Sequence, residues 1–243
     1  MTAREAEIIE LIRKEVKPAL GCTEPIAVAL AVAKAMETVE EKCGLSGPDW
    51  RMEGAYSLCI EVSGNILKNG MGVGIPGTGM VGLHIAAALG AVCGKSSYGL
   101  EVLNDLDEDS IAKAKEMVEA KDVTVGLAET DHKLYVKATV LCKDGHSACA
   151  VIEDDHDNIV ETWFDQAQLT SSHKCEGADA AAQKSTLDYK LTVKEIVDFA
   201  STVAYEDIEF ILESRTLNMA LAEEGMKGCY GLKVGWAINL SDN

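Results

Sequence analysis

Four short segments with the alternating pattern of β-strands follow one another in the second half of the chain, and they constrain the fold more than any other feature. They cover residues 123–128, 133–141, 147–153 and 158–164. Only short polar turns such as residues 143–145 separate them, whereas a crossover between parallel strands needs about a dozen residues. We therefore expect antiparallel neighbours, joined by a further alternating segment at residues 55–63 in one mainly antiparallel sheet.

Helical patterns occupy both ends of the chain and the regions around the first expected strand. The expected helices cover residues 3–16, 26–36, 80–92, 107–120 and 192–203, and a last helix ends at Gly225. The segment 26–36 carries a single charge, Lys34, which is typical of a helix buried on nearly all sides. Thr192 and Glu195 have the spacing of a capping box. This order of elements predicts an α+β fold, in which a mainly antiparallel sheet packs with helices and a helix pair lies at each end.

A small, polar segment without periodicity divides the chain. It covers residues 166–190 and is typical of a linker. The expected organisation is an α+β domain at residues 1–165, which includes an N-terminal helical arm, followed by this linker and a helical segment at residues 191–243. We interpret the last segment as the start of a truncated C-terminal helical domain.

The chain is strongly acidic, with 22 Lys and Arg against 40 Asp and Glu and a formal net charge of −18. Nucleic acids and anionic membrane surfaces are bound mainly through basic side chains, so neither is an expected partner. The longest weakly polar stretch, residues 82–94, is shorter than the roughly 18 to 20 residues that a membrane-spanning helix needs. The acidic N-terminus lacks the basic start of a secretory signal, and we expect a cytoplasmic protein.

A glycine-rich passage precedes the apolar helix expected at residues 80–92. Residues 77–82 read Gly-Thr-Gly-Met-Val-Gly, and Glu101 lies 19 positions after Gly82, which is the spacing of a dinucleotide-binding fingerprint. That fingerprint requires a central strand before its first glycine, and the preceding residues here are glycines and a proline. Two further interpretations stay open. The backbone amides could form a cradle for a carboxylate, or the glycines could serve only close helix packing.

Cys22 differs from the other seven cysteines because it lies in a turn directly before a helix start. Thr23, Glu24 and Pro25 supply a capping candidate, an acid and a first-turn proline. Unpaired amides and the helix dipole favour a thiolate at such a position, whereas the nearby carboxylate of Glu24 opposes it. From the residues alone, Cys22 is either a nucleophile or metal ligand, or an inert buried thiol.

Three segments in order along the chain resemble one enzyme family. The first segment covers residues 15–26, Glu-Val-Lys-Pro-Ala-Leu-Gly-Cys-Thr-Glu-Pro-Ile. The second comprises Lys-Asn-Gly at residues 68–70, residues 76–82 and Ala-Ala-Ala-Leu-Gly-Ala at residues 86–91. The third covers Leu-Asn-Met-Ala-Leu-Ala-Glu-Glu-Gly at residues 217–225, with Gly231 and Leu232. Together these segments are similar to the iron–sulfur L-cysteine desulfidases, which are relatives of the L-serine dehydratase alpha chain.

The resemblance implies a lyase that holds a [4Fe–4S] cluster on three cysteines, with Cys22 as one iron ligand. Such an enzyme eliminates sulfide from L-cysteine, or water from L-serine, and yields pyruvate and ammonia. An open iron site acts as a Lewis acid on the leaving group, which matters because thiolate leaves poorly. His156 and Asn158 match a further family segment, whereas Asp155 and Asp157 depart from it and add negative charge.

The substrate would be a small amino acid, and the candidates to bind it are polar residues near expected helix starts together with the two residues that match the further family segment. They are Thr23, Glu24, Asn65, Lys68, Asn69, Thr78, Gly79, His156 and Asn158. The residue that abstracts the proton is not identified by the sequence.

Members of the family continue for roughly another domain length, and the remaining cluster cysteines lie in that region. The resemblance therefore implies that this chain is a fragment, one of two separate chains, or the product of a decayed gene. Its expected partner is a second helical domain or subunit. The chain could also form a homodimer. Two alternative functions remain, a dinucleotide-dependent oxidoreductase and a non-catalytic amino-acid-binding or partner module.

Overall fold

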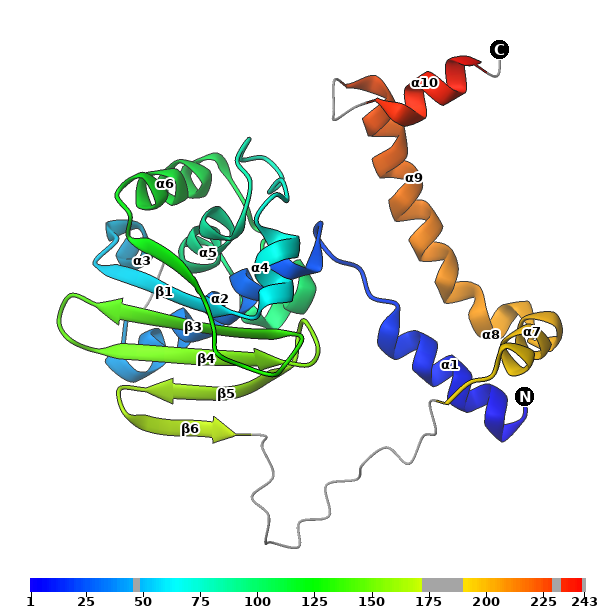
Figure 1. Ribbon diagram of the computed structural model, residues 1–243, viewed down its shortest axis with the longest axis horizontal. Coiled ribbons are helices and arrows are strands. Elements are labelled where there is room, and N and C mark those ends of the chain that lie inside the picture. Colours follow the sequence, from blue (N-terminus) through cyan, green and yellow to red (C-terminus); the bar gives the residue numbers. More distant parts are fainter. Residues whose placement is uncertain (46–48, 172–189, 229–232, 242–243) are drawn as a thin grey trace, which may run out of the picture. The chain divides into compact units, whose positions relative to one another are not determined.

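A computed structural model describes residues 1–45, 49–171, 190–228 and 233–241 of the chain (Figure 1). The chain divides into two compact units. One comprises Ala19–Asp179, and the other comprises Met1–Pro18 together with Ala180–Asn243. The first unit contains the sheet and is called the sheet unit below, and the second is called the helical unit.

The sheet unit is built on one six-stranded sheet in the order β2-β1-β3-β4-β5-β6. The strands are β1 (Tyr56–Val62), β2 (Val123–Leu127), β3 (Tyr135–Cys142), β4 (Ser147–Glu153), β5 (Ile159–Phe164) and β6 (Ala167–Ser171). Only β1 and β2 are parallel, and every other neighbouring pair is antiparallel. The expected α+β fold with a mainly antiparallel sheet is therefore confirmed.

Two details of the expected sheet are wrong. β2 does not pair with β3, because β1 lies between them and pairs with β2 in parallel. The connection from β1 to β2 contains three α-helices and one 3-10 helix, which is long enough for a parallel crossover. Part of the expected linker at residues 166–190 also belongs to the sheet, since Ala167–Ser171 forms β6 and pairs with β5.

Helices cover one face of this sheet (Figure 1). They are α2 (Thr23–Cys43), α3 (Asp49–Glu53), α4 (Gly64–Gly70), α5 (Leu83–Val92), the short 3-10 helix η1 (Ser96–Glu101) and α6 (Glu108–Glu119). Alternate residues of β1 are buried beneath them, namely Tyr56, Leu58, Ile60 and Val62. The intervening residues of the strand are half-buried, as expected for a sheet with one packed face.

The helix α2 is the centre of the core. It extends well beyond the expected range of 26–36, and it packs against β3, β4, β5 and α5. Every residue from Pro25 to Ala33 is buried, and most of them are alanine or valine. These small side chains let α5 approach closely. A Cβ atom built on Gly90 of α5 would lie 2.4 Å from the backbone oxygen of Ala29.

The helical unit consists of short helices with little buried surface. They are α1 (Ala3–Glu15), α7 (Val193–Thr202), α8 (Tyr205–Ile208), η2 (Glu209–Ile211), α9 (Leu212–Lys227) and α10 (Val234–Ser241). Thr192 and Glu195 form the expected capping box at the start of α7. Among the described residues, no helix is both long and apolar enough to cross a membrane.

The contact between α2 and α5 gives a stability prediction. Gly90→Ala should lower the free energy of unfolding of the sheet unit by about 1–3 kcal/mol, because the added methyl group overlaps the Ala29 backbone in a packed core. The loss should exceed the roughly 1 kcal/mol that alanine gains over glycine in a helix. Gly126→Ala is the control, since a Cβ atom there meets nothing within 4 Å. Urea denaturation measures both variants, and equal stability of the two would show that α5 can shift away from α2.

Candidate functional site

The candidate site lies at the N-terminal end of α2. Cys22 occupies the N-cap position in an extended conformation, and it follows Gly21, whose φ of +96° favours glycine. The expected helix start is confirmed. Of the two expected capping residues, Thr23 and Cys22, it is Cys22 that occupies the N-cap position, although its side chain makes no capping hydrogen bond. The Cys22 side chain is exposed.

Glu24 brings residues from three elements together. Its Oε2 atom accepts a hydrogen bond from Cys22 Sγ at 2.9 Å, and its Oε1 atom accepts one from Asn69 Nδ2 at 3.1 Å. Asn69 lies in α4, so the carboxylate connects α4 to the turn before α2. His156, in the connection between β4 and β5, contributes electrostatically to lowering the pKa of Glu24. Four predicted site residues, Cys22, Glu24, Asn69 and His156, therefore lie in one region.

The carboxylate of Glu24 has the largest influence on the pKa of Cys22. The hydrogen bond to Glu24 raises the pKa of the Cys22 thiol above its ordinary value, and partial burial adds to the effect. The backbone amides of Glu24 and Thr23 act in the opposite direction but are outweighed. The hydrogen bond from Cys22 in turn lowers the pKa of Glu24, with Asn69 assisting. The net effect at Cys22 therefore opposes the thiolate that the helix start alone would favour.

The other predicted site residues differ in how accessible they are. Asn65 and Lys68 are exposed on α4, and Thr23 is half-buried in the first turn of α2. Thr78 is only 2% exposed, and its hydroxyl donates to the carbonyl oxygen of Ile75 and accepts from the amide of Met80. Thr78 thus holds its own loop together. Similarly, Asn158 Nδ2 donates to the carbonyl oxygen of Glu153 within its own turn, at 2.9 Å.

The glycine-rich passage forms a tight loop before α5. Gly74 and Val81 form an antiparallel bridge, and Gly77 and Gly79 turn the chain between them with φ values of +75° and +68°. Gly77 therefore lies in a hairpin-like loop. A dinucleotide fingerprint requires its first glycine to end a strand of the sheet, and Gly77 does not. Gly82 is fixed by packing as well, because a Cβ atom there would lie 2.9 Å from the Met71 oxygen.

The described residues supply one cysteine ligand for a cluster at this site. The other described cysteines are half-buried and lie elsewhere in the sheet unit, at positions 43, 59, 93, 142 and 149. Within the part of the chain that the structure describes, no group of three or more His, Cys, Asp or Glu side chains could hold a metal ion. The donor set around Cys22 therefore fits one ligand of a cluster, and it does not fit a cluster held by these residues alone.

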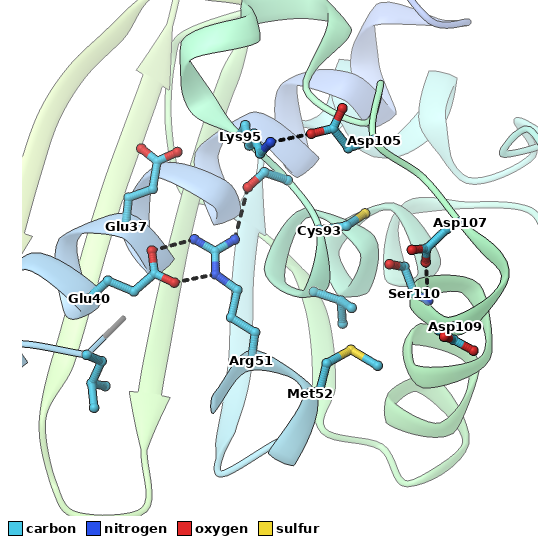
Figure 2. A pocket seen from close by; sticks show the side chains of 13 residues that line it. Glu37, Glu40, Arg51, Met52, Cys93, Lys95, Asp105, Asp107, Asp109 and Ser110 are labelled. Atoms are coloured by element: carbon cyan, nitrogen blue, oxygen red, sulfur yellow. Dashed lines mark hydrogen bonds and ion pairs between the residues drawn. The ribbon is translucent and has the colours of Figure 1, made fainter. Parts of the chain in front are cut away.

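A cleft of about 690 Å³ lies near the C-terminal end of α2, and none of the predicted site residues lines it (Figure 2). Arg51, only 8% exposed, binds both carboxylate oxygens of Glu40 at 2.6 Å and donates to the carbonyl oxygen of Gly94 at 2.9 Å. Lys95 pairs with Asp105 in the same cleft. Arg51 thus holds α2, α3 and the end of α5 together, while Lys95 pairs with Asp105 in the segment that follows α5. The signal for this cleft in the sequence is the acidic pair Glu37 and Glu40, which interrupts the apolar pattern of α2 in its C-terminal half.

The protonation of Cys22 can be tested by removing one charge. Glu24→Gln should increase the rate of alkylation of Cys22 by iodoacetamide severalfold near neutral pH, because the main cause of its raised pKa is removed and only the thiolate reacts. Mass spectrometry measures the modification at Cys22. Asp144→Asn is the control, since this carboxylate acts on Cys43 and Cys142 instead. An unchanged rate in Glu24→Gln would contradict the assigned role of the carboxylate.

His132 gives a prediction of pH dependence for the turn that carries His156. Its Nδ1 atom lies 3.0 Å from Asp154 Oδ1, and this hydrogen bond raises the pKa of His132 above its ordinary value, with Glu153 and Asp131 contributing. A raised folded-state pKa means that the stabilisation is complete below the ordinary pKa and disappears as the pH rises through the higher folded-state value. Because the pair is exposed, the effect should be small.

Urea denaturation at about pH 5.5 and about pH 8.5 brackets the titration of this histidine. Both His132→Gln and Asp154→Asn should reduce the change in unfolding midpoint between the two pH values, and the double variant should add nothing further. Additive effects of the two substitutions would show that these side chains act independently.

Comparisons with known proteins identify close homologues over almost the whole chain. It is 43% identical over 237 residues to a UPF0597 protein of Phocaeicola vulgatus, covering 97% of this chain and 51% of the relative. A UPF0597 protein of Shewanella pealeana is 42% identical over 227 residues, covering 93% of this chain and 50% of the relative. One from Dichelobacter nodosus is 41% identical over 234 residues, covering 96% and 51%.

These names state no activity. No family model matches the chain, and no solved structure matches it. The chain spans about half the length of the curated relatives that it matches. By sequence, it is a close homologue of proteins named UPF0597 over that half of their length.

Proposed function

We propose that this chain provides part of the active site of a [4Fe–4S]-dependent lyase that eliminates sulfide from L-cysteine, or water from L-serine. The products are pyruvate and ammonia. The observation that carries the proposal is the convergence of Cys22, Glu24, Asn69 and His156 at the start of α2. All four lie in segments that resemble the iron–sulfur L-cysteine desulfidases. Reduced thiols are maintained in the cytoplasm, which is where we place this activity.

Cys22 is the proposed metal ligand of this chain. An exposed thiol in a glycine-led turn can reach a bound group without rearrangement of the core. The bound cluster would supply a Lewis-acidic iron for the leaving group of the substrate. To become a ligand, Cys22 must lose its proton, and Glu24 Oε2 already accepts the hydrogen bond from that sulfur atom. Asn69 holds the other oxygen, so it fixes which atom of the carboxylate faces Cys22.

The exposed polar face of α4 is the proposed binding surface for the substrate carboxylate. Asn65 and Lys68 are both exposed there, and an ammonium group with an adjacent amide suits a carboxylate. The exposed Gly79 belongs to the loop before α5 and could add a backbone amide. His156, which matches the family segment and acts electrostatically on Glu24, would contribute to the same site.

A non-catalytic amino-acid-binding module remains the second candidate. The observation that favours it is the single exposed thiol among the described residues, since a cluster needs several cysteine ligands. The lyase would contain iron and the binding module would not, so a measurement of iron content distinguishes the two proposed functions.

The test is anaerobic reconstitution with iron and sulfide, using the full chain co-expressed with the unmatched half of the Phocaeicola vulgatus relative. The assembly should acquire visible cluster absorption and form pyruvate from L-cysteine. Cys22→Ser should keep the fold, because the exposed side chain changes by one atom, but should abolish both signals. Cys142→Ser is the control and should retain both, because burial raises the pKa of that thiol to about 11.

Full iron content and turnover in the Cys22→Ser assembly would show that the ligand assignment is wrong. An assembly that forms but contains no iron, while it binds L-cysteine in calorimetry, would favour the non-catalytic module.

A further inference from the structure

The helix α7 carries an apolar stripe that is exposed. Val193, Ile196 and Val197 are spaced by three and four residues, so they lie on one side of the helix. Their exposed fractions are 79%, 51% and 57%. In an ordinary amphipathic helix, such a stripe faces the core and the polar residues face water.

The polar side of α7 makes the contact with the rest of the helical unit. Glu195 accepts hydrogen bonds from the guanidinium group of Arg4 in α1, at 3.2 Å. The same guanidinium donates to the carbonyl oxygen of Lys190, just before α7. The helix is therefore attached to its unit through charged groups, whereas its apolar stripe faces outward.

The helix α9 shows the same excess of exposed apolar surface. Leu217 and Leu221 are one turn apart and are 50% and 73% exposed. None of the described residues of α7, α8 or α9 is buried. Helices of this length are marginal in water without packing, so such a surface requires a partner. We call Val193, Ile196, Val197, Leu217 and Leu221 the apolar helix surface.

We propose that the apolar helix surface binds a polypeptide equivalent to the half of the UPF0597 relatives that this chain does not match. The relatives are about twice as long as the matched region, and this chain aligns with them along 97% of its own length. In each relative, the counterpart of this surface is covalently joined to the unmatched half. That linkage provides a high effective concentration for contact between the two halves. The inference holds whether or not the chain acts as a lyase.

Binding can be measured directly with the full chain and the unmatched half of the Phocaeicola vulgatus relative as a separate polypeptide. Isothermal titration calorimetry and size-exclusion chromatography should give a one-to-one complex. Ile196→Glu should weaken its affinity at least about tenfold, because a charge at the centre of an apolar interface is left without a partner. Leu141→Glu is the matched control on the sheet unit, since Leu141 is 45% exposed and Ile196 is 51% exposed. The Leu141→Glu variant should bind the partner polypeptide with the affinity of the unaltered chain.

Two results would overturn the proposal. One is that the partner polypeptide is folded, as judged by circular dichroism, but does not bind this chain. The other is a homodimer of this chain that Ile196→Glu dissociates, which would assign the surface to a second copy.

If the separate polypeptide does not fold, hydrogen exchange decides the question. The segments aligned with α7 and α9 should be protected at least about tenfold more in the intact relative than in this chain. Equal exchange rates would contradict the proposal. Because none of these measurements reads enzyme activity, their failure is distinguishable from a failure of the proposed lyase.

Discussion

The close approach of α2 and α5 is the constraint on which the sheet unit depends. α2 is buried between α5 and the strands β3 to β5, and its backbone at Ala29 leaves no space for a side chain at Gly90. A second close contact, between Gly94 and Ala33, continues this packing one turn further along. Small residues shorten the distance between two helices and increase the dispersion contacts of each. The direction of α2, and therefore the position of both its ends, follows from this packing.

The two ends of α2 have different roles as a result. At the C-terminal end, Glu40 forms an ion pair with the buried Arg51. Arg51 also donates a hydrogen bond to the carbonyl oxygen of Gly94. A buried ion pair of this kind is costly to break because one charge is left without its partner. At the N-terminal end, Cys22 lies in an exposed turn, and its thiol donates a hydrogen bond to Glu24. One end of α2 is thus anchored by a largely buried ion pair, while the other end presents an accessible thiol.

Alternation and helical periodicity were sufficient to predict most of the elements, because burial on one face leaves a regular pattern in the sequence. β6 could not be predicted in this way, since Ala167–Ser171 is exposed throughout and has no buried face. The parallel pairing of β1 with β2 was equally hidden. It depends on how the helices between the two strands cross over, whereas the local pattern of β2 resembles that of any other strand.

The candidate site was predictable in its residues but not in its electrostatics. The position of Cys22 before a helix could be inferred from Gly21, Thr23 and Pro25. The contact between Asn69 and Glu24 joins residues 45 positions apart, and it exists only because α4 ends beside the start of α2. That contact orients the carboxylate, and the carboxylate outweighs the helix amides at the sulfur. The local sequence indicates whether each neighbouring group raises or lowers the pKa of Cys22. Which of these effects is larger depends on the distances between the groups, and these come only from the structure.

The two units are stabilised by different kinds of interaction, and this difference bears on how the chain works. The sheet unit contains a continuous core of buried aliphatic side chains that extends from α2 through β4. The helical unit buries only Ile8 and Ile9 among its described residues, and it is otherwise stabilised by capping boxes and by charged contacts such as that of Arg4 with Glu195. Exposed ion pairs contribute little free energy and are weakened by salt, so they cannot replace a core. The sheet unit therefore supplies a packed framework for the turn at Cys22, whereas the described helices of the helical unit bury far fewer apolar side chains.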